Sequence, residues 1–136
     1  MQLPLAKGDA TFFNPALFHA AGTNRSAGIK RMANLPQVSS AFGRAIESVD
    51  TTANCLAVFG ALKALKARGG EGALRNLITV VAEGYPFPTN LDHDQPIGGM
   101  APPTQADLLG RAVAEDWDDT RLRTELTAKQ QRRRTA

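Results

Sequence analysis

The spacing of apolar residues changes along the chain, from short runs to a helical repeat. Residues 10–13 and 17–19 are short aromatic and β-branched or apolar runs next to turn signals, and they predict strands. Residues 30–40 predict a further strand, bent at Pro36. Two or three strands make a poor sheet, because exposed strand edges must be paired or covered. The first 40 residues therefore predict the end of a larger β-structure.

From residue 41 onward, apolar residues recur every three to four positions, which predicts helices. A short helix is expected over residues 41–50. Asp50 or Thr51 then caps a longer helix, and Gly69-Gly70 supplies its C-terminal stop signal. This part of the chain predicts packed helices in place of strands.

The second half of the chain predicts helices on both sides of a long loop. Residues 72–81 predict a third helix, although residues 78–81 also fit a strand. Residues 83–103 carry five prolines and three glycines, which predicts an extended loop. Thr104 and Asp107 have the spacing of a capping box and open the next helix.

A last helix begins at Asp118 or Asp119 and places Leu122 and Leu126 inward. Trp117 is expected to anchor the junction of the last two helices. The predicted fold class is therefore mixed and mainly α, with N-terminal strands followed by a helical extension.

The length and composition of the chain exclude some classes of protein. The 136 residues are the size of one domain, and no run approaches the 18 apolar residues of a membrane span. Cys55 is the only cysteine, which excludes a disulfide framework and favours a reducing, cytoplasmic location. It lies on an apolar helix stripe and is expected to be a buried hydrophobe. Residues 1–40 hold four basic side chains and one acidic one, a local charge of +3.

One N-terminal motif carries chemistry, and it reads Gly8-Asp9-Ala10-Thr11-Phe12-Phe13-Asn14-Pro15-x-x-x-His19-x-x-Gly22-x-Asn24-x-Ser26. The motif resembles the C-terminal core motif of phytanoyl-CoA dioxygenase-type enzymes. The resemblance implies an oxygenase that uses iron(II), takes 2-oxoglutarate as co-substrate and has a double-stranded β-helix (jelly-roll) core. Its reaction would couple 2-oxoglutarate decarboxylation to the hydroxylation of a small-molecule substrate.

The resemblance assigns roles to individual residues. His19 stands at the position of the distal histidine that binds the metal. Lys30 or Arg31 stands where a basic residue pairs with the 2-oxoglutarate carboxylate. An arginine would bind that carboxylate with two hydrogen bonds, whereas a lysine would act as a point charge. Asn24 and Ser26 either satisfy loop backbone groups or contact the co-substrate or substrate.

The main departure from the family pattern concerns the other metal ligands. The His-x-Asp motif that should precede His19 is absent, and the only other histidine lies in Asp92-His93-Asp94-Gln95, within the proline-rich loop. One ligand cannot hold iron usefully. We therefore expect residues 1–40 to be the C-terminal strands of a jelly-roll core and residues 41–136 to be its helical extension. As an isolated chain, this fragment is expected to be inactive.

Two other interpretations stay open. The chain is alternatively a non-catalytic helical interaction module whose basic tail, with Arg121, Arg123 and Arg132–Arg134, binds a polyanion or a protein partner. A separate polypeptide that supplies the missing strands is the third possibility. No membrane partner is predicted. Nucleic acid is not expected either, because the arginines lack interleaved aromatic residues.

Overall fold

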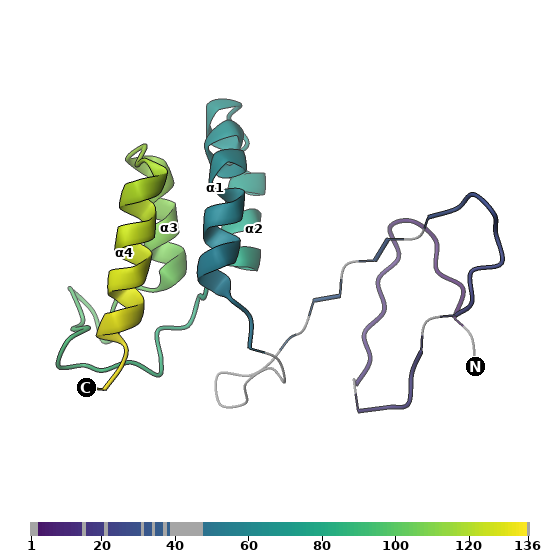
Figure 1. The fold of residues 1–136 in the computed structure, drawn as a ribbon, viewed down its shortest axis with the longest axis horizontal. Coiled ribbons are helices and arrows are strands. Elements are labelled where there is room, and N and C mark those ends of the chain that lie inside the picture. The colour runs from purple at the N-terminus through teal and green to yellow at the C-terminus, as the bar shows by residue number, and fades with distance from the viewer. Residues whose placement is uncertain are drawn as a thin grey trace. The chain divides into compact units, whose positions relative to one another are not determined.

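The computed structural model describes residues 3–14, 16–20, 22–30, 32–33, 35–36, 38 and 48–135. The chain forms two compact units, Met1–Pro36 and Gln37–Ala136. The described residues of the second unit form four helices, labelled in Figure 1: α1 (Thr51–Ala67), α2 (Glu71–Val81), α3 (Gln105–Ala114) and α4 (Asp119–Arg132). The prediction of a mainly helical chain is confirmed.

Side-chain caps fix where these helices begin. The Asp50 carboxylate accepts a hydrogen bond from the Ala53 backbone N–H at 2.9 Å, so Asp50, not Thr51, caps α1. The Asp118 carboxylate accepts one from the Arg121 N–H at 2.7 Å and caps α4. Each cap satisfies an N–H group that has no partner within the helix.

Helix α3 begins with the predicted capping box. The Thr104 hydroxyl accepts a hydrogen bond from the Asp107 N–H at 3.0 Å, and the Asp107 carboxylate accepts one from the Thr104 N–H at 2.8 Å. Aspartate takes the place that glutamate or glutamine usually fills in this motif. The local prediction of this helix start is confirmed.

The connection between α1 and α2 depends on glycine. Gly69 has φ of +71°, in the left-handed region that glycine adopts readily, and the Gly70 N–H donates to the Leu65 carbonyl at 3.0 Å. This turn ends α1 and starts α2, which runs through residue 81. The alternative of a strand at 78–81 is wrong.

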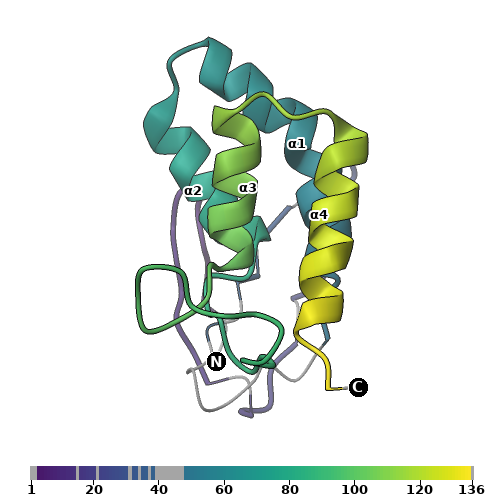
Figure 2. The same cartoon turned by 90° about the vertical axis from the view of Figure 1, so that its left-hand side faces the viewer.

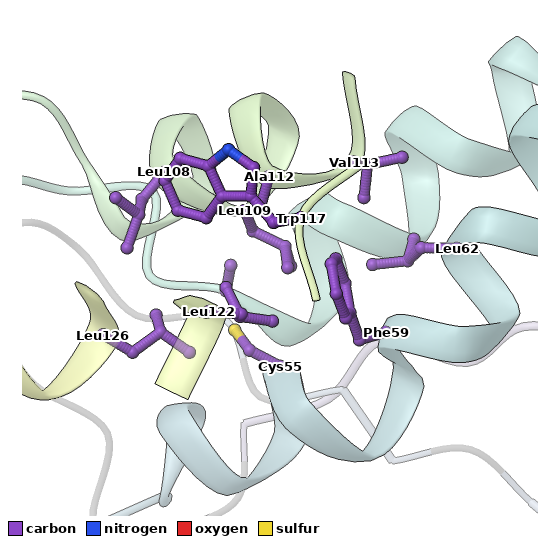
Figure 3. Close-up of a cluster of buried hydrophobic side chains, with 11 residues drawn as sticks. Cys55, Phe59, Leu62, Leu108, Leu109, Ala112, Val113, Trp117, Leu122 and Leu126 are labelled. Atoms are coloured by element: carbon purple, nitrogen blue, oxygen red, sulfur yellow. The ribbon is translucent and has the colours of Figure 1, made fainter. Parts of the chain in front are cut away.

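The four helices enclose one apolar core (Figures 2 and 3). Helix α1 packs against each of the other three helices, and α3 packs against α2 and α4. Trp117 is 3% exposed and lies between α3 and α4, as predicted. The other buried apolar residues are Cys55, Phe59, Leu62, Ala82, Leu108, Leu109, Ala112, Val113, Leu122 and Leu126.

Residues 83–103 form the long connection without helix or strand that was predicted. The first residue of this loop is attached to the start of α3: the Glu83 N–H donates to Gln105 Oε1 at 2.9 Å, and the Ala106 N–H donates to the Glu83 carbonyl at 3.1 Å. The loop lies at the end of the helical unit where α4 finishes (Figure 2).

The N-terminal unit contains turns. The Asp9 N–H donates to the Ala6 carbonyl at 3.1 Å, with Gly8 at φ +100° between them. The Leu17 N–H donates to the Asn14 carbonyl at 3.1 Å. Both turns lie beside the runs at residues 10–13 and 17–19, where the sequence carries turn signals.

The predicted strands at 10–13 and 17–19 are not shown, since the described part of residues 3–38 contains no strand. A strand is completed by hydrogen bonds to a neighbouring strand, and these described residues supply none. Of the helix predicted over 41–50, residues 41–47 lie outside the described residues, and residues 48–50 are not helical.

None of the helices that the structure describes has the length and apolar character needed to cross a membrane.

Candidate functional site

His19 lies beside a turn in the N-terminal unit, and its ring is oriented by two contacts. Its Nδ1 is 2.7 Å from the Leu17 carbonyl oxygen, so Nδ1 carries the proton and donates. The Phe13 ring meets the imidazole edge-on, with 4.9 Å between ring centroids. In the neutral form the lone pair is then on Nε2, which has no hydrogen-bonding partner among the described residues. A backbone carbonyl that fixes the tautomer in this way is typical of metal-binding histidines.

Asn24 and Ser26 make hydrogen bonds within the loop that follows His19 in the sequence. Asn24 Nδ2 donates to the Ile29 carbonyl at 2.8 Å, and Asn24 Oδ1 accepts from the Ser26 N–H at 3.0 Å and from its hydroxyl at 2.6 Å. These contacts satisfy backbone groups of the loop, which is one of the two predicted roles. Lys30 follows this loop directly and is exposed. Arg31 lies outside the described residues.

Among the described residues, His19 does not belong to a cluster of potential metal ligands. In the part of the chain that the structure describes, no group of three or more His, Cys, Asp or Glu residues could hold a metal ion. His93 is exposed in a turn of the 83–103 loop. The described residues therefore do not fit a complete iron centre.

The helical unit contains a buried ionic cluster that the sequence analysis did not identify. Lys129 and Asp94 are each 5% exposed, and Lys129 Nζ lies 3.4 Å from Asp94 Oδ2. Lys129 also donates to the Pro103 carbonyl, and the Thr89 hydroxyl donates to Asp94 at 2.8 Å. Burial lowers the pKa of Lys129, while the Asp94 charge acts in the opposite direction.

A sequence signal for Lys129 does exist. Leu122, Leu126 and Lys129 are spaced by four and three residues, so the lysine occupies the inward stripe of α4. A charged residue at such a position requires a buried partner. The partner, Asp94, lies in the loop, 35 residues away in the sequence. No pattern in the sequence around Lys129 identifies Asp94 as its partner.

The C-terminal arginines contact the same loop. Arg132 Nε lies 3.8 Å from Asp94 Oδ1, and Arg133 Nε donates to the Pro88 carbonyl at 3.2 Å. The Arg134 carbonyl accepts a hydrogen bond from Asn90 at 3.1 Å. Part of the basic tail is therefore used to fasten the loop to the end of α4.

Cys55 is a buried core residue, as predicted. Its side chain is fully buried among apolar groups, and its Sγ lies 3.9 Å from the Val81 carbonyl oxygen. Burial raises the pKa of the Cys55 thiol to about 11. The thiol is therefore protonated at neutral pH, which does not suit a nucleophile.

One comparison with known proteins agrees with the N-terminal motif. No curated protein and no solved structure matches this chain. The model of the phytanoyl-CoA dioxygenase family matches residues 1–32, a range that includes His19 and the whole motif through Ser26. The resemblance predicted from the motif is thereby confirmed for the N-terminal segment, which is similar to phytanoyl-CoA dioxygenases, a family of iron- and 2-oxoglutarate-dependent oxygenases.

Proposed function

We propose that residues 1–40 are the C-terminal strands of the jelly-roll core of an iron(II)- and 2-oxoglutarate-dependent oxygenase, and that residues 41–136 are its helical extension. The observation that carries this proposal is the family match over residues 1–32. In the complete enzyme, the bound iron and 2-oxoglutarate would supply the oxidising chemistry that hydroxylates a C–H bond of a small-molecule substrate.

In this proposal His19 is one of the iron ligands. The hydrogen bond from its Nδ1 to the Leu17 carbonyl supports the role, because it orients the ring and leaves Nε2 available. Lys30 or Arg31 pairs with the 2-oxoglutarate carboxylate. Asn24 and Ser26 shape the loop that leads to these two cations.

The chain does not turn over by itself in this proposal, because a His-x-Asp motif is absent from its 136 residues. Two further ligands have to come from residues outside this sequence, and a separate chain that supplies the missing strands is one source. The reduced, buried Cys55 agrees with a cytoplasmic location.

The first test has two stages. The purified chain is assayed for iron-dependent release of carbon dioxide from 2-oxoglutarate, and none is expected. The coding DNA upstream of Met1 is then read in all three frames for a His-x-Asp motif, and a protein joining that segment to this chain is assayed in the same way. The joined protein should release carbon dioxide, and His19→Ala should reduce that release at least about 100-fold.

Comparison of Lys30→Ala with Arg31→Ala identifies the co-substrate residue, since its loss should raise the KM for 2-oxoglutarate more than it lowers kcat. Iron-dependent turnover by the 136-residue chain alone would contradict the proposed inactivity. A joined protein that keeps full activity after His19→Ala would contradict the role of His19, and an upstream region without the motif would count against the oxygenase.

A further inference from the structure

A cavity of about 490 Å³ lies in the helical unit, between residues 92–97 of the loop and helices α3 and α4. Pro96, Ile97 and Leu108 give it an apolar wall. Its remaining lining is rich in charged groups from the loop and both helices. Concave sites with an apolar wall and a few polar groups are typical of small-molecule binding.

Two of the three carboxylates that line the cavity already have partners. Asp94 is paired with Lys129 at 3.4 Å. Asp107 accepts hydrogen bonds from the N–H and the hydroxyl of Thr104 within the capping box. Only Asp92, which is exposed, contributes a carboxylate without a hydrogen-bonding partner among the described residues.

Two guanidinium groups in the cavity keep free N–H donors. Arg111 stacks over the Trp117 ring at 5.3 Å, and among the described residues its N–H groups have no acceptor. Arg132 has Asp94 Oδ1 at 3.8 Å from its Nε, and its side chain is 41% exposed. The Arg132 terminal amino groups likewise have no acceptor within the described part of the chain. A guanidinium fork of this kind matches the geometry of a carboxylate.

The loop wall of the cavity is held in place before any ligand arrives. Lys129 bonds to Asp94 and to the Pro103 carbonyl, which lie at the two ends of residues 94–103. One buried side chain therefore closes the base of this segment. A preformed wall reduces the ordering entropy that binding would otherwise require.

We propose that this cavity binds a small organic molecule with a single carboxylate, held by Arg111 and Arg132, with a short apolar chain against Ile97 and Leu108. The unpaired Asp92 and the exposed His93 also line the cavity. Because Asp92 repels further negative charge, the site favours a monocarboxylate over phosphate or a polyanion. None of the residues that line this cavity belongs to the oxygenase motif, and the proposal does not depend on that motif.

The test titrates the full chain, labelled for NMR, with hexanoate, with 1-hexanol and with inorganic phosphate. Hexanoate should give saturable shifts of the amide signals of Ile97 and Leu108. The alcohol, which has the same apolar chain without the charge, and phosphate should each bind at least about 10-fold more weakly. This comparison needs no variant.

Variants then assign the binding to the two arginines. Arg111→Gln and Arg132→Gln should each weaken hexanoate binding at least about 10-fold, whereas Arg123→Gln, an exposed change on the same helix as Arg132, should leave it unchanged. Circular dichroism of each variant checks that the helices are retained. Equal binding of hexanoate and hexanol, tighter binding of phosphate, or unchanged binding by both glutamine variants would overturn the proposal.

Discussion

The two units of this protein differ in how much apolar surface they bury. In the N-terminal unit Phe12, Phe18 and Met32 are each more than 90% exposed. In the helical unit Phe59 and Leu109 are at most 1% exposed, inside the apolar core that the four helices enclose (Figure 3). The family match lies in the first unit and the packed core lies in the second. The segment that resembles a known family and the segment that packs an apolar core are therefore different regions of one chain.

Exposed aromatic side chains have a physical consequence for the N-terminal unit. Ordering its backbone costs about 1–2 kcal/mol per residue, and burial of apolar surface is the main term that can offset this. The turns at Ala6–Asp9 and Asn14–Leu17 are local and bury little. The unit should therefore gain most of its order from a surface that covers Phe12 and Phe18, whereas the helical unit has its own core.

The largest expected effect contrasts one phenylalanine from each unit. Phe59→Ala removes a fully buried ring from α1 and should lower the free energy of unfolding by about 3–5 kcal/mol. Phe18→Ala removes an exposed ring and should change it by less than about 0.5 kcal/mol. Urea denaturation of the full chain, followed by helical circular dichroism, measures both changes.

The contrast would break if Phe18→Ala destabilised the chain as much as Phe59→Ala, because the N-terminal ring would then be packed in solution. Lys7→Ala, an exposed change in the same unit as Phe18, controls for general effects of substitution there.

A second, smaller effect is expected at the buried ion pair. Lys129→Met keeps the apolar stem and removes the ammonium group, which leaves the Asp94 carboxylate buried with a weaker set of partners. Loss of one member of a buried pair costs about 3 kcal/mol. Hydrogen exchange of residues 95–102 should also speed up, since Lys129 closes the base of that segment.

The double variant Lys129→Met, Asp94→Asn should recover part of this loss, because no uncompensated charge stays buried. Lys7→Met in the N-terminal unit is the matched control and should have little effect. A Lys129→Met protein with unchanged stability and unchanged exchange would show that the pair does not hold the loop.

The helices could be predicted from the sequence because their signals are local. The caps at Asp50, Thr104 and Asp118 each act within three residues of the side chain that makes them. The turn at Gly69 likewise needs only the end of α1. Such features survive in any context that allows the helix, so a single sequence is enough to locate them.

The strands and the ionic cluster depend on distant partners, and the sequence could not supply these. A strand at 10–13 requires neighbouring strands that the described residues do not provide. Lys129 requires Asp94, 35 residues away. At the candidate site, the motif identified His19 through a resemblance, but its contact with the Leu17 carbonyl follows only from the fold of the turn. Contacts between residues that are distant in the sequence could therefore not be predicted.

The smallest expected effect concerns Asp107, and it tests whether the capping box at the start of α3 contributes to the stability of the fold. Hydrogen bonds from the backbone and the hydroxyl of Thr104 lower the pKa of Asp107 below its ordinary 3.8. A carboxyl group with a lowered pKa stabilises the fold above its unfolded pKa, and this contribution is lost as the pH falls through the folded value. Asp107→Asn should therefore lower the free energy of unfolding by about 0.5–1 kcal/mol at neutral pH.

That difference between the wild-type chain and Asp107→Asn should shrink as the pH falls through the folded pKa of Asp107, which lies below 3.8, because the aspartate is then protonated and uncharged like the asparagine. Urea denaturation at a series of pH values measures it, with Asp119→Asn, a change in the first turn of α4 outside its N-cap, as the control. A difference that stays constant down to the most acidic sample would mean that the Asp107 charge adds nothing to the capping box. The local signal that predicted α3 so directly would then mark where the helix starts without stabilising it through charge.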